Sequence, residues 1–172
     1  LGQLPTKACM NPKALLSWNT DKHYLLDLAQ KGIPIVPSTI IPRQHPNPLS
    51  QWAAHLEYEH LIVKPTIAGA ARLTYQLKDE QIGAFDREFT KLNAKEDFIL
   101  QPFVSSVTSF GELSLMVMGG KCTHAVQKRV KVGDFRVQDD FGGTVHHFTL
   151  TPELIEFAEM VMGLIDPKPL YG

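Results

Sequence analysis

Hydrophobic positions in the first third of the chain recur first with a helical period and then stop at proline. Residues 21–31 carry leucine and alanine at helical spacing and are followed by Gly32, which predicts a helix with its usual end signal. The next segment, 33–37, contains two prolines and can only be extended, so we expect a strand there. A proline-rich loop over 42–49 and a short helical stretch around 51–58 should follow.

The middle of the chain has the clearest strand pattern. His60–Pro65 is apolar apart from its ends and stops at proline, which predicts a buried strand. Residues 66–71 are small, and residues 72–78 alternate like a half-exposed strand, so the three segments should form a hairpin-like flap. Apolar residues at spacings of three and four predict a helix with one buried stripe over 79–93. Another strand should cover 98–104.

The last third is expected to consist of successive strands and one helix. We predict strands over 113–118, 122–130 and 135–138, with turns at Gly119-Gly120 and Gly133-Asp134. Thr151 followed by Pro152 is a helix start with its capping residue, and the helix should reach Ile165. Because the strands follow one another as hairpins, the fold class is α+β and not a doubly wound sheet.

Composition and net charge limit the classes of partner that this chain can bind. The 172 residues suffice for one domain or two small lobes sharing a seam, and 44% hydrophobic with 20% charged residues is typical of a folded globular protein. The formal net charge of -1 gives no global field for nucleic acid or an anionic membrane, so neither is expected as a partner. An anion site would have to be local. The chain also has no run of about 20 apolar residues that could span a bilayer.

The cysteines and histidines do not predict a metal site. Cys9 and Cys122 lie far apart and lack zinc-site spacing, so a reducing, cytoplasmic setting is expected. None of the seven histidines, including His146-His147, has metal-ligand spacing. The first residue is not Met and the last segment is apolar and uncapped, so we expect both ends to be cuts in a longer protein.

Lys64 is the first candidate for binding chemistry. It ends an apolar strand, where a lysine is costly to bury without an anionic partner. The small loop Thr66–Ala71 follows, and its backbone N–H groups could close over phosphates. The alternatives are a lysine that reaches the surface along its aliphatic stem and a plain hairpin turn.

Glu112 and the segment 101–104 are candidates for nucleoside binding. A carboxylate after Gly111 could accept hydrogen bonds from both ribose hydroxyls, and the extended 101–104 segment could offer backbone groups and an apolar edge to adenine. The alternative interpretations are that Glu112 is an ordinary surface glutamate and that 101–104 is an edge strand, and the sequence does not decide between them.

Lys128 and Arg136 form the third candidate group. Alternation places Lys128 and Arg129 on opposite faces of an extended strand, so they cannot both reach one ligand. Arg136 would lie near Lys128 if the two strands pair, and two converging cations suit a triphosphate and a carboxylate. A solvated, charge-balanced turn is the alternative.

Several segments, in their order and spacing along the chain, resemble the ATP-grasp superfamily. The resemblance is to its glutathione synthetase, ribosomal-protein glutamate ligase and cycloserine-biosynthesis ligase branches. The match covers nearly the whole chain, and its most specific element is Gly133-Asp-Phe-Arg136 with the following Gly142-Gly143. The other matching segments are Asn11-Pro-Lys13, Asp21-Lys22, Gly32-Ile-Pro-Ile-Val-Pro37, Val63-Lys-Pro65 with its small-residue loop, Gln101-Pro-Phe-Val104, Gly111-Glu112 and His124-Ala-Val-Gln-Lys128.

The resemblance implies a role for each candidate residue. The nucleotide phosphates would be bound by Lys22, Lys64 and a mobile flap that includes Thr66, Gly69 and Ala70. Adenine would be held by Gln101, Phe103 and Val104, the ribose by Glu112, and the phosphate and acyl-phosphate oxygens by the catalytic pair Lys128 and Arg136. Positive groups fixed around a transferring phosphoryl group stabilise its transition state.

The resemblance also divides the chain. It implies an N-terminal extension over 1–20, a small lobe with the phosphate flap over 21–104, and the start of a large lobe over 105–172, the two lobes gripping the nucleotide. The resemblance implies ATP and Mg²⁺ as cofactors. The metal ligands of the family are not found in this sequence, so we expect them beyond residue 172. Gln138 stands where several relatives have Asn, and Ala70-Ala71 stand where others have more glycine.

The leading hypothesis is therefore the ATP-binding portion of a ligase. Such an enzyme uses ATP to phosphorylate a small-molecule carboxylate, after which an amine or similar nucleophile displaces the phosphate. We expect these 172 residues alone to bind nucleotide without turning over. The alternatives are a non-catalytic nucleotide-binding or regulatory module of the same fold, and a plain α+β domain with no nucleotide.

Overall fold

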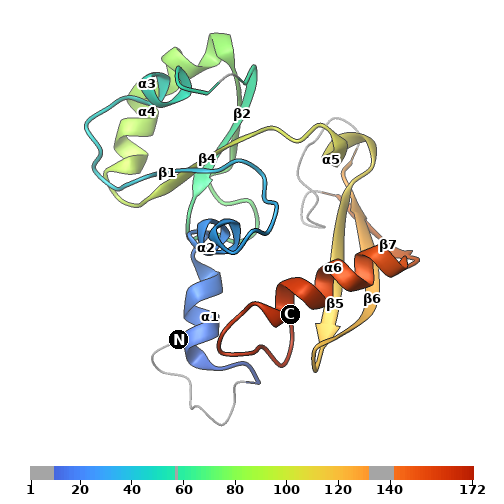
Figure 1. Ribbon diagram of the computed structural model, residues 1–172. Helices are drawn as coiled ribbons and strands as arrows, with labels where there is room; N and C mark the ends of the chain where they lie inside the picture. The colour runs from blue at the N-terminus through green and yellow to red at the C-terminus, as the bar shows by residue number, and fades with distance from the viewer. Residues whose placement is uncertain (1–9, 57, 132–141) are drawn as a thin grey trace. The chain divides into compact units, whose positions relative to one another are not determined.

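A computed structural model describes residues 10–56, 58–131 and 142–172, which divide into two units (Figure 1). Thr20–Val104 form one, here called the four-stranded unit. Leu1–Asn19 are grouped with Ser105–Gly172 in the other, the three-stranded unit. Helix α1 (Lys13–Thr20) thus begins in the three-stranded unit and ends at the first residue of the four-stranded unit.

The sheet of the four-stranded unit has the order β1-β4-β2-β3, and every neighbouring pair is antiparallel. Its strands are β1 (Thr39–Ile41), β2 (His60–Pro65), β3 (Tyr75–Lys78) and β4 (Phe98–Pro102). Alternation along β2 buries Leu61, Val63 and Pro65 and leaves Lys64 on the half-exposed face, as a period of two requires. The sheet therefore sets the side of β2 from which Lys64 projects.

Helices α3 (Leu49–Ala53) and α4 (Asp79–Asn93) pack beside each other over one face of this sheet. α4 presents Ile82 and Phe89 to the core, and the ring of Phe89 meets that of Phe98 edge to face at 5.4 Å between centroids. Lys78 precedes α4, and its backbone N–H donates to the side chain of Gln81, which fixes the start of the helix. The core members are Ile41, Leu49, Ala53, Leu61, Val63, Leu77, Ile82, Phe89, Phe98 and Leu100.

The expected strand at 33–37 was wrong. Helix α2 (Tyr24–Gln30) ends before Gly32, whose φ of +83° suits glycine, and residues 33–38 then run without strand pairing to β1. Pro34 and Pro37 have no backbone N–H to give a ladder, which explains why pairing begins only at Thr39.

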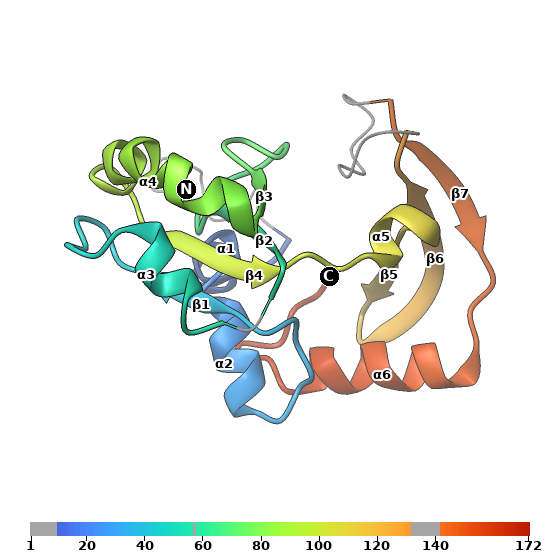
Figure 2. The ribbon, with the colours of Figure 1, turned by 90° about the horizontal axis from the view of Figure 1, so that it is seen from above.

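The three-stranded unit holds an antiparallel sheet of order β5-β6-β7, against which helix α6 (Pro152–Gly163) lies (Figure 2). The strands are β5 (Glu112–Met118), β6 (Lys121–Arg129) and β7 (Thr144–Phe148). The Thr151 side chain accepts a hydrogen bond from Leu154 N at 3.4 Å, as the capping prediction requires. Glu159 on α6 accepts from Cys122 N at 3.1 Å, which joins the helix to β6.

The ends of the described chain are joined within this unit. The Asn11 side chain donates to Tyr171 O at 2.6 Å and accepts from Leu170 N and Tyr171 N at 2.9 and 3.0 Å. Gly172 exchanges both backbone hydrogen bonds with Val117 on β5. Asn11 thus fixes the segment before α1 to the last residues of the sequence.

Helix α1, helix α5 (Ser106–Ser109) and strand β7 were not among the expected elements. The predicted turn at Gly133-Asp134 and strand over 135–138 lie outside the described residues. Across the part of the chain that is described, no helix has the length and apolar character needed to cross a bilayer.

Candidate functional site

Lys22 holds the start of the flap. Its Nζ donates to the carbonyl oxygens of Pro65 (3.2 Å), Thr66 (3.1 Å) and Ala68 (3.1 Å). Its backbone N–H also donates to Thr66 O at 2.9 Å. Three carbonyl dipoles around one ammonium form a compact oxygen cage of the kind that a phosphate group would also provide.

Lys22, Lys64 and Arg72 form a cluster of positive charge. Burial, followed by the charge of Lys64, lowers the pKa of Lys22, and Arg72 adds a smaller effect in the same direction. Asp21 opposes this shift without cancelling it. The structure therefore brings together the two lysines predicted to bind phosphate, and an anion placed between them would relieve their repulsion.

Asp21 connects the beginning of α2 with the flap. Its carboxylate accepts from His23 N at 3.2 Å and lies 2.6 Å from His23 Nδ1, and Thr66 forms a further side-chain hydrogen bond with it. Burial raises the pKa of Asp21, but the hydrogen bonds from His23, with its charge and the bond from Thr66, leave that pKa below its ordinary value. The buried Thr66 is thus fixed by its side chain, its carbonyl and its N–H, which donates to Asp97 O at 3.0 Å.

The tip of the flap has left-handed backbone at non-glycine residues. Ala70, Ala71 and Leu73 have φ of 49°, 54° and 49°. An L-residue in this region carries a steric cost that glycine does not, so Ala70 and Ala71 are strained. Such strain persists only where surrounding contacts hold it.

The end of β4 carries the predicted adenine residues. Gln101 is buried and donates through Nε2 to Ser38 Oγ at 2.8 Å, so its side chain fixes the segment before β1. Phe103 N donates to His60 O at 2.9 Å, which extends the pairing with β2 by one bond past the strand. Val104 is 37% exposed and offers an apolar side chain at the end of the unit.

In the three-stranded unit, the structure pairs two predicted site residues with each other. Glu112 and Lys128 are cross-strand partners in β5 and β6, and Lys128 Nζ lies 3.2 Å from Glu112 Oε1. Both side chains are partly exposed, which keeps them accessible to a ligand. Arg136, predicted to act with Lys128, and Gln138 lie outside the described residues.

Gly111 fixes the backbone next to Glu112. Its φ is +105°, and a Cβ built there would stand 2.3 Å from Lys128 O. No side chain fits between these two strands at this point. The close approach holds the Glu112–Lys128 pair in its register.

Among the residues that the structure describes, no group of three or more His, Cys, Asp or Glu side chains is arranged to bind a metal ion.

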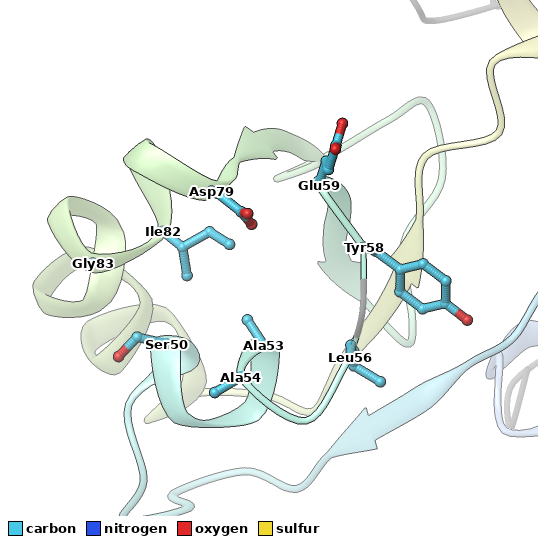
Figure 3. A pocket seen from close by; sticks show the side chains of 9 residues that line it. All are labelled: Ser50, Ala53, Ala54, Leu56, Tyr58, Glu59, Asp79, Ile82 and Gly83. Carbon is cyan, nitrogen blue, oxygen red and sulfur yellow. The ribbon is translucent and has the colours of Figure 1, made fainter.

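A pocket of about 360 Å³ lies between α3 and the start of α4 (Figure 3). Ala53, Asp79 and Ile82 face its interior, while Tyr58 and Glu59 point away. None of the predicted nucleotide-binding residues lines it. The pocket is therefore separate from the flap.

Two residues at this site were not predicted as site residues, namely Arg72 in the flap and Asp21 before α2. The sequence pattern places Arg72 at the start of an expected strand, and Asp21 at the start of an expected helix and in a motif. A cation directly after a small-residue loop, within a motif set that already predicts phosphate binding, is the signal that could have identified Arg72.

Comparison with known proteins shows the family of this chain. The profile of the family described as prokaryotic glutathione synthetase, ATP-grasp domain, matches residues 25–171. Cycloserine biosynthesis protein DcsG of Streptomyces lavendulae is 32% identical over 145 residues, which cover 82% of this chain and 46% of that protein.

Solved structures give the same result. The crystal structure of D-cycloserine synthetase DcsG superposes with a TM-score of 0.73 at 26% identity and covers 90% of this chain and 54% of its own. The ATP-grasp ligase PsnB, in a complex with Mg and ADP, superposes with a TM-score of 0.62 at 16% identity, over 90% of this chain and 44% of its own. The second of these likenesses shows the fold alone.

The fold and these matches define an ATP-grasp ligase domain. Within that class, the chain belongs to the family of prokaryotic glutathione synthetase ATP-grasp domains. The resemblance read from the sequence and the α+β fold that it implied are thereby confirmed. The chain spans about half the length of the relatives that it matches.

Proposed function

We propose that this chain is the ATP-binding portion of a ligase that joins a small-molecule carboxylate to an amine or a similar nucleophile. In this reaction a carboxylate oxygen attacks the γ-phosphorus of ATP, which gives an acyl phosphate and ADP. The nucleophile then attacks the acyl carbon and phosphate leaves. The observation that supports the proposal best is the place of Lys22, whose half-buried ammonium contacts three carbonyls at the start of the flap beside the charge of Lys64.

That observation bears on phosphate because two ammonium groups in a partly desolvated place repel each other. A polyphosphate removes the repulsion and replaces contacts between ammonium and neutral carbonyls with contacts between ammonium and negatively charged oxygens, which are stronger. We assign the phosphates to Lys22, Lys64 and the flap residues Thr66, Gly69 and Ala70.

The remaining assignments follow the resemblance. The backbone of Gln101 and the side chains of Phe103 and Val104 would hold adenine. Glu112 would accept the ribose hydroxyls, for which Lys128 must release it from their 3.2 Å ion pair. Lys128 and Arg136 would then stabilise negative charge on the transferred phosphoryl group.

Thermal unfolding with and without ATP and Mg²⁺ tests the proposal. Nucleotide at a hundred times its dissociation constant should add about 2.7 kcal/mol to the free energy of unfolding. Lys64→Ala should remove most of this gain. Lys91→Ala, which removes an exposed lysine on α4, is the matched control and should keep it. Equal gains in the wild type and Lys64→Ala would refute the role of Lys64, and no gain in the wild type would refute nucleotide binding.

A further inference from the structure

The Arg72 guanidinium donates hydrogen bonds to a carboxylate that lies outside the flap and to a carbonyl oxygen of the flap. Its Nη1 donates to Glu96 Oε1 at 2.9 Å and its Nη2 to Glu96 Oε2 at 2.5 Å. The Nη2 group also donates to Ile67 O at 2.9 Å. A planar guanidinium that meets a carboxylate with two parallel bonds is fixed in direction as well as distance.

Glu96 is itself attached to a fixed part of the unit. It lies in the connection 94–97 between α4 and β4, and its carbonyl accepts from Asn93 Nδ2 at 3.4 Å. The next residue, Asp97, accepts from Thr66 N at 3.0 Å and from Arg43 N at 2.6 Å. The connection 94–97 therefore holds the flap at its first residue through Asp97 and near its tip through Glu96.

The strained backbone lies on both sides of Arg72. Ala71 and Leu73, on either side of Arg72, both have positive φ. Arg72 N donates to Gly69 O at 3.0 Å and Thr74 N donates to Ala71 O at 3.1 Å, and these turn bonds together with the guanidinium hold the strained residues in place. Removal of one such contact lets the backbone relax out of the left-handed region.

We propose that the Arg72–Glu96 pair is a positioning device that holds the flap, residues 66–73, in the conformation that receives the nucleotide phosphates. The proposal rests on the proposed function, because it names a device within the same site. Arg72 acts on the phosphates through the flap backbone and through its charge near Lys22, while its guanidinium stays on Glu96.

The titration of the pair is consistent with this assignment. The hydrogen bond from Arg72 lowers the pKa of Glu96, and the same bond raises that of Arg72. Because the pair is partly exposed, it contributes little to global stability. Its effect should be local to the flap.

Glu96→Gln distinguishes a positioning role from direct contact. If Arg72 were a phosphate ligand restrained by Glu96, the variant would release it and strengthen ATP binding. If the pair positions the flap, the variant weakens binding of ATP with Mg²⁺ by about fivefold, at the lower end of measured coupling effects, and leaves binding of adenosine unchanged. Calorimetric titration of the 172-residue chain with each ligand measures both.

Two further variants complete the test. Glu88→Gln removes the acidic partner from the exposed Lys91–Glu88 pair on α4 and should alter neither affinity. Arg72→Glu should weaken ATP binding, and the double variant Arg72→Glu with Glu96→Arg should recover part of it by restoring an ion pair of reversed sign.

Hydrogen exchange of residues 66–73, without nucleotide, provides a readout that does not depend on ATP. Faster exchange there in Glu96→Gln, with unchanged exchange in β2 and β4, is expected. Unchanged flap exchange, or ATP affinity equal to or above that of the wild type, would overturn the proposal while nucleotide binding by the wild type stood. A wild type that bound neither adenosine nor ATP would instead overturn the proposed function and the positioning of phosphates with it.

Discussion

The cations of the flap and the cation of the β5–β6 hairpin are held in different ways. Lys22 is partly buried and its ammonium contacts backbone carbonyls, whereas Lys128 lies on a regular antiparallel pair and contacts an exposed carboxylate. The conformation of the flap thus depends on charged side chains that contact it. The hairpin conformation depends on its backbone, and its charged side chains are free to change partners.

This difference predicts that the hairpin will be most sensitive at a glycine. Gly111→Ala places a Cβ against Lys128 O at 2.3 Å with φ at +105°, so the strands must separate. We expect a loss of about 3 kcal/mol or more in the free energy of unfolding, measured by urea denaturation.

Gly83→Ala serves as its control. Gly83 lies within α4 with nothing near the new Cβ, and alanine there should stabilise by up to about 1 kcal/mol. Similar losses of stability at both glycines would contradict a steric cost specific to the close approach at Gly111.

The next largest difference is expected between the effects of replacing Lys22 and Lys128 on the free energy of unfolding. Lys22→Met removes the ammonium that donates to the carbonyls of Pro65, Thr66 and Ala68, although Thr66 O keeps its bond from the backbone N–H of residue 22. We expect the substitution to cost about 1–3 kcal/mol in the absence of nucleotide. Lys128→Met removes one exposed ion pair and should change stability by less than about 1 kcal/mol. Urea denaturation of both variants under one buffer checks this, and a larger loss at Lys128 would reverse the comparison.

A smaller effect is expected from the flap alanines. Ala70→Gly or Ala71→Gly relieves a left-handed φ and should raise stability by about 0.5–1 kcal/mol after the entropy cost of glycine. Ala68→Gly, at a position that does not have positive φ, should lower it slightly. Thermal denaturation of the three variants distinguishes relief of strain from a general effect of glycine, because a general effect would give all three the same sign.

The smallest expected effect is on pH dependence. A carboxyl whose pKa is lowered in the folded state stabilises it above the ordinary pKa, and this contribution is lost as the pH falls through and below 4.5 in the case of Glu96. Glu96→Gln should therefore lose less stability than the wild type on acidification through that range. Parallel stability curves for the two proteins would show that Arg72 does not shift this carboxyl.

Elements with local signals were predicted from the sequence. The bounds of β2 and α4 match their expected ranges because an apolar run ended by proline in one and a three-to-four spacing in the other are properties of short segments. Strand β7 was missed because its residues are mostly exposed, so no apolar alternation marks it. Helix α1 buries only Leu15 and gave no stripe.

The site was predicted by residue type and not by its contacts. The motifs singled out Lys22 and Lys64, and the structure places their charges near each other. The cage around Lys22 joins residues up to 46 positions apart, and the Arg72–Glu96 pair joins residues 24 positions apart. Contacts over such separations depend on how the sheet folds, which no local pattern encodes.

The order β1-β4-β2-β3 has a consequence for synthesis on the ribosome. Strand β4 lies between two strands that are both made before it, so β1 and one edge of β2 await the same later segment. A nascent chain that has not yet emerged past Pro102 presents both edges to solvent, and unpaired edges are where strands of other chains attach. The time between the emergence of β2 and that of β4 from the ribosome therefore sets how long this unit is vulnerable to aggregation.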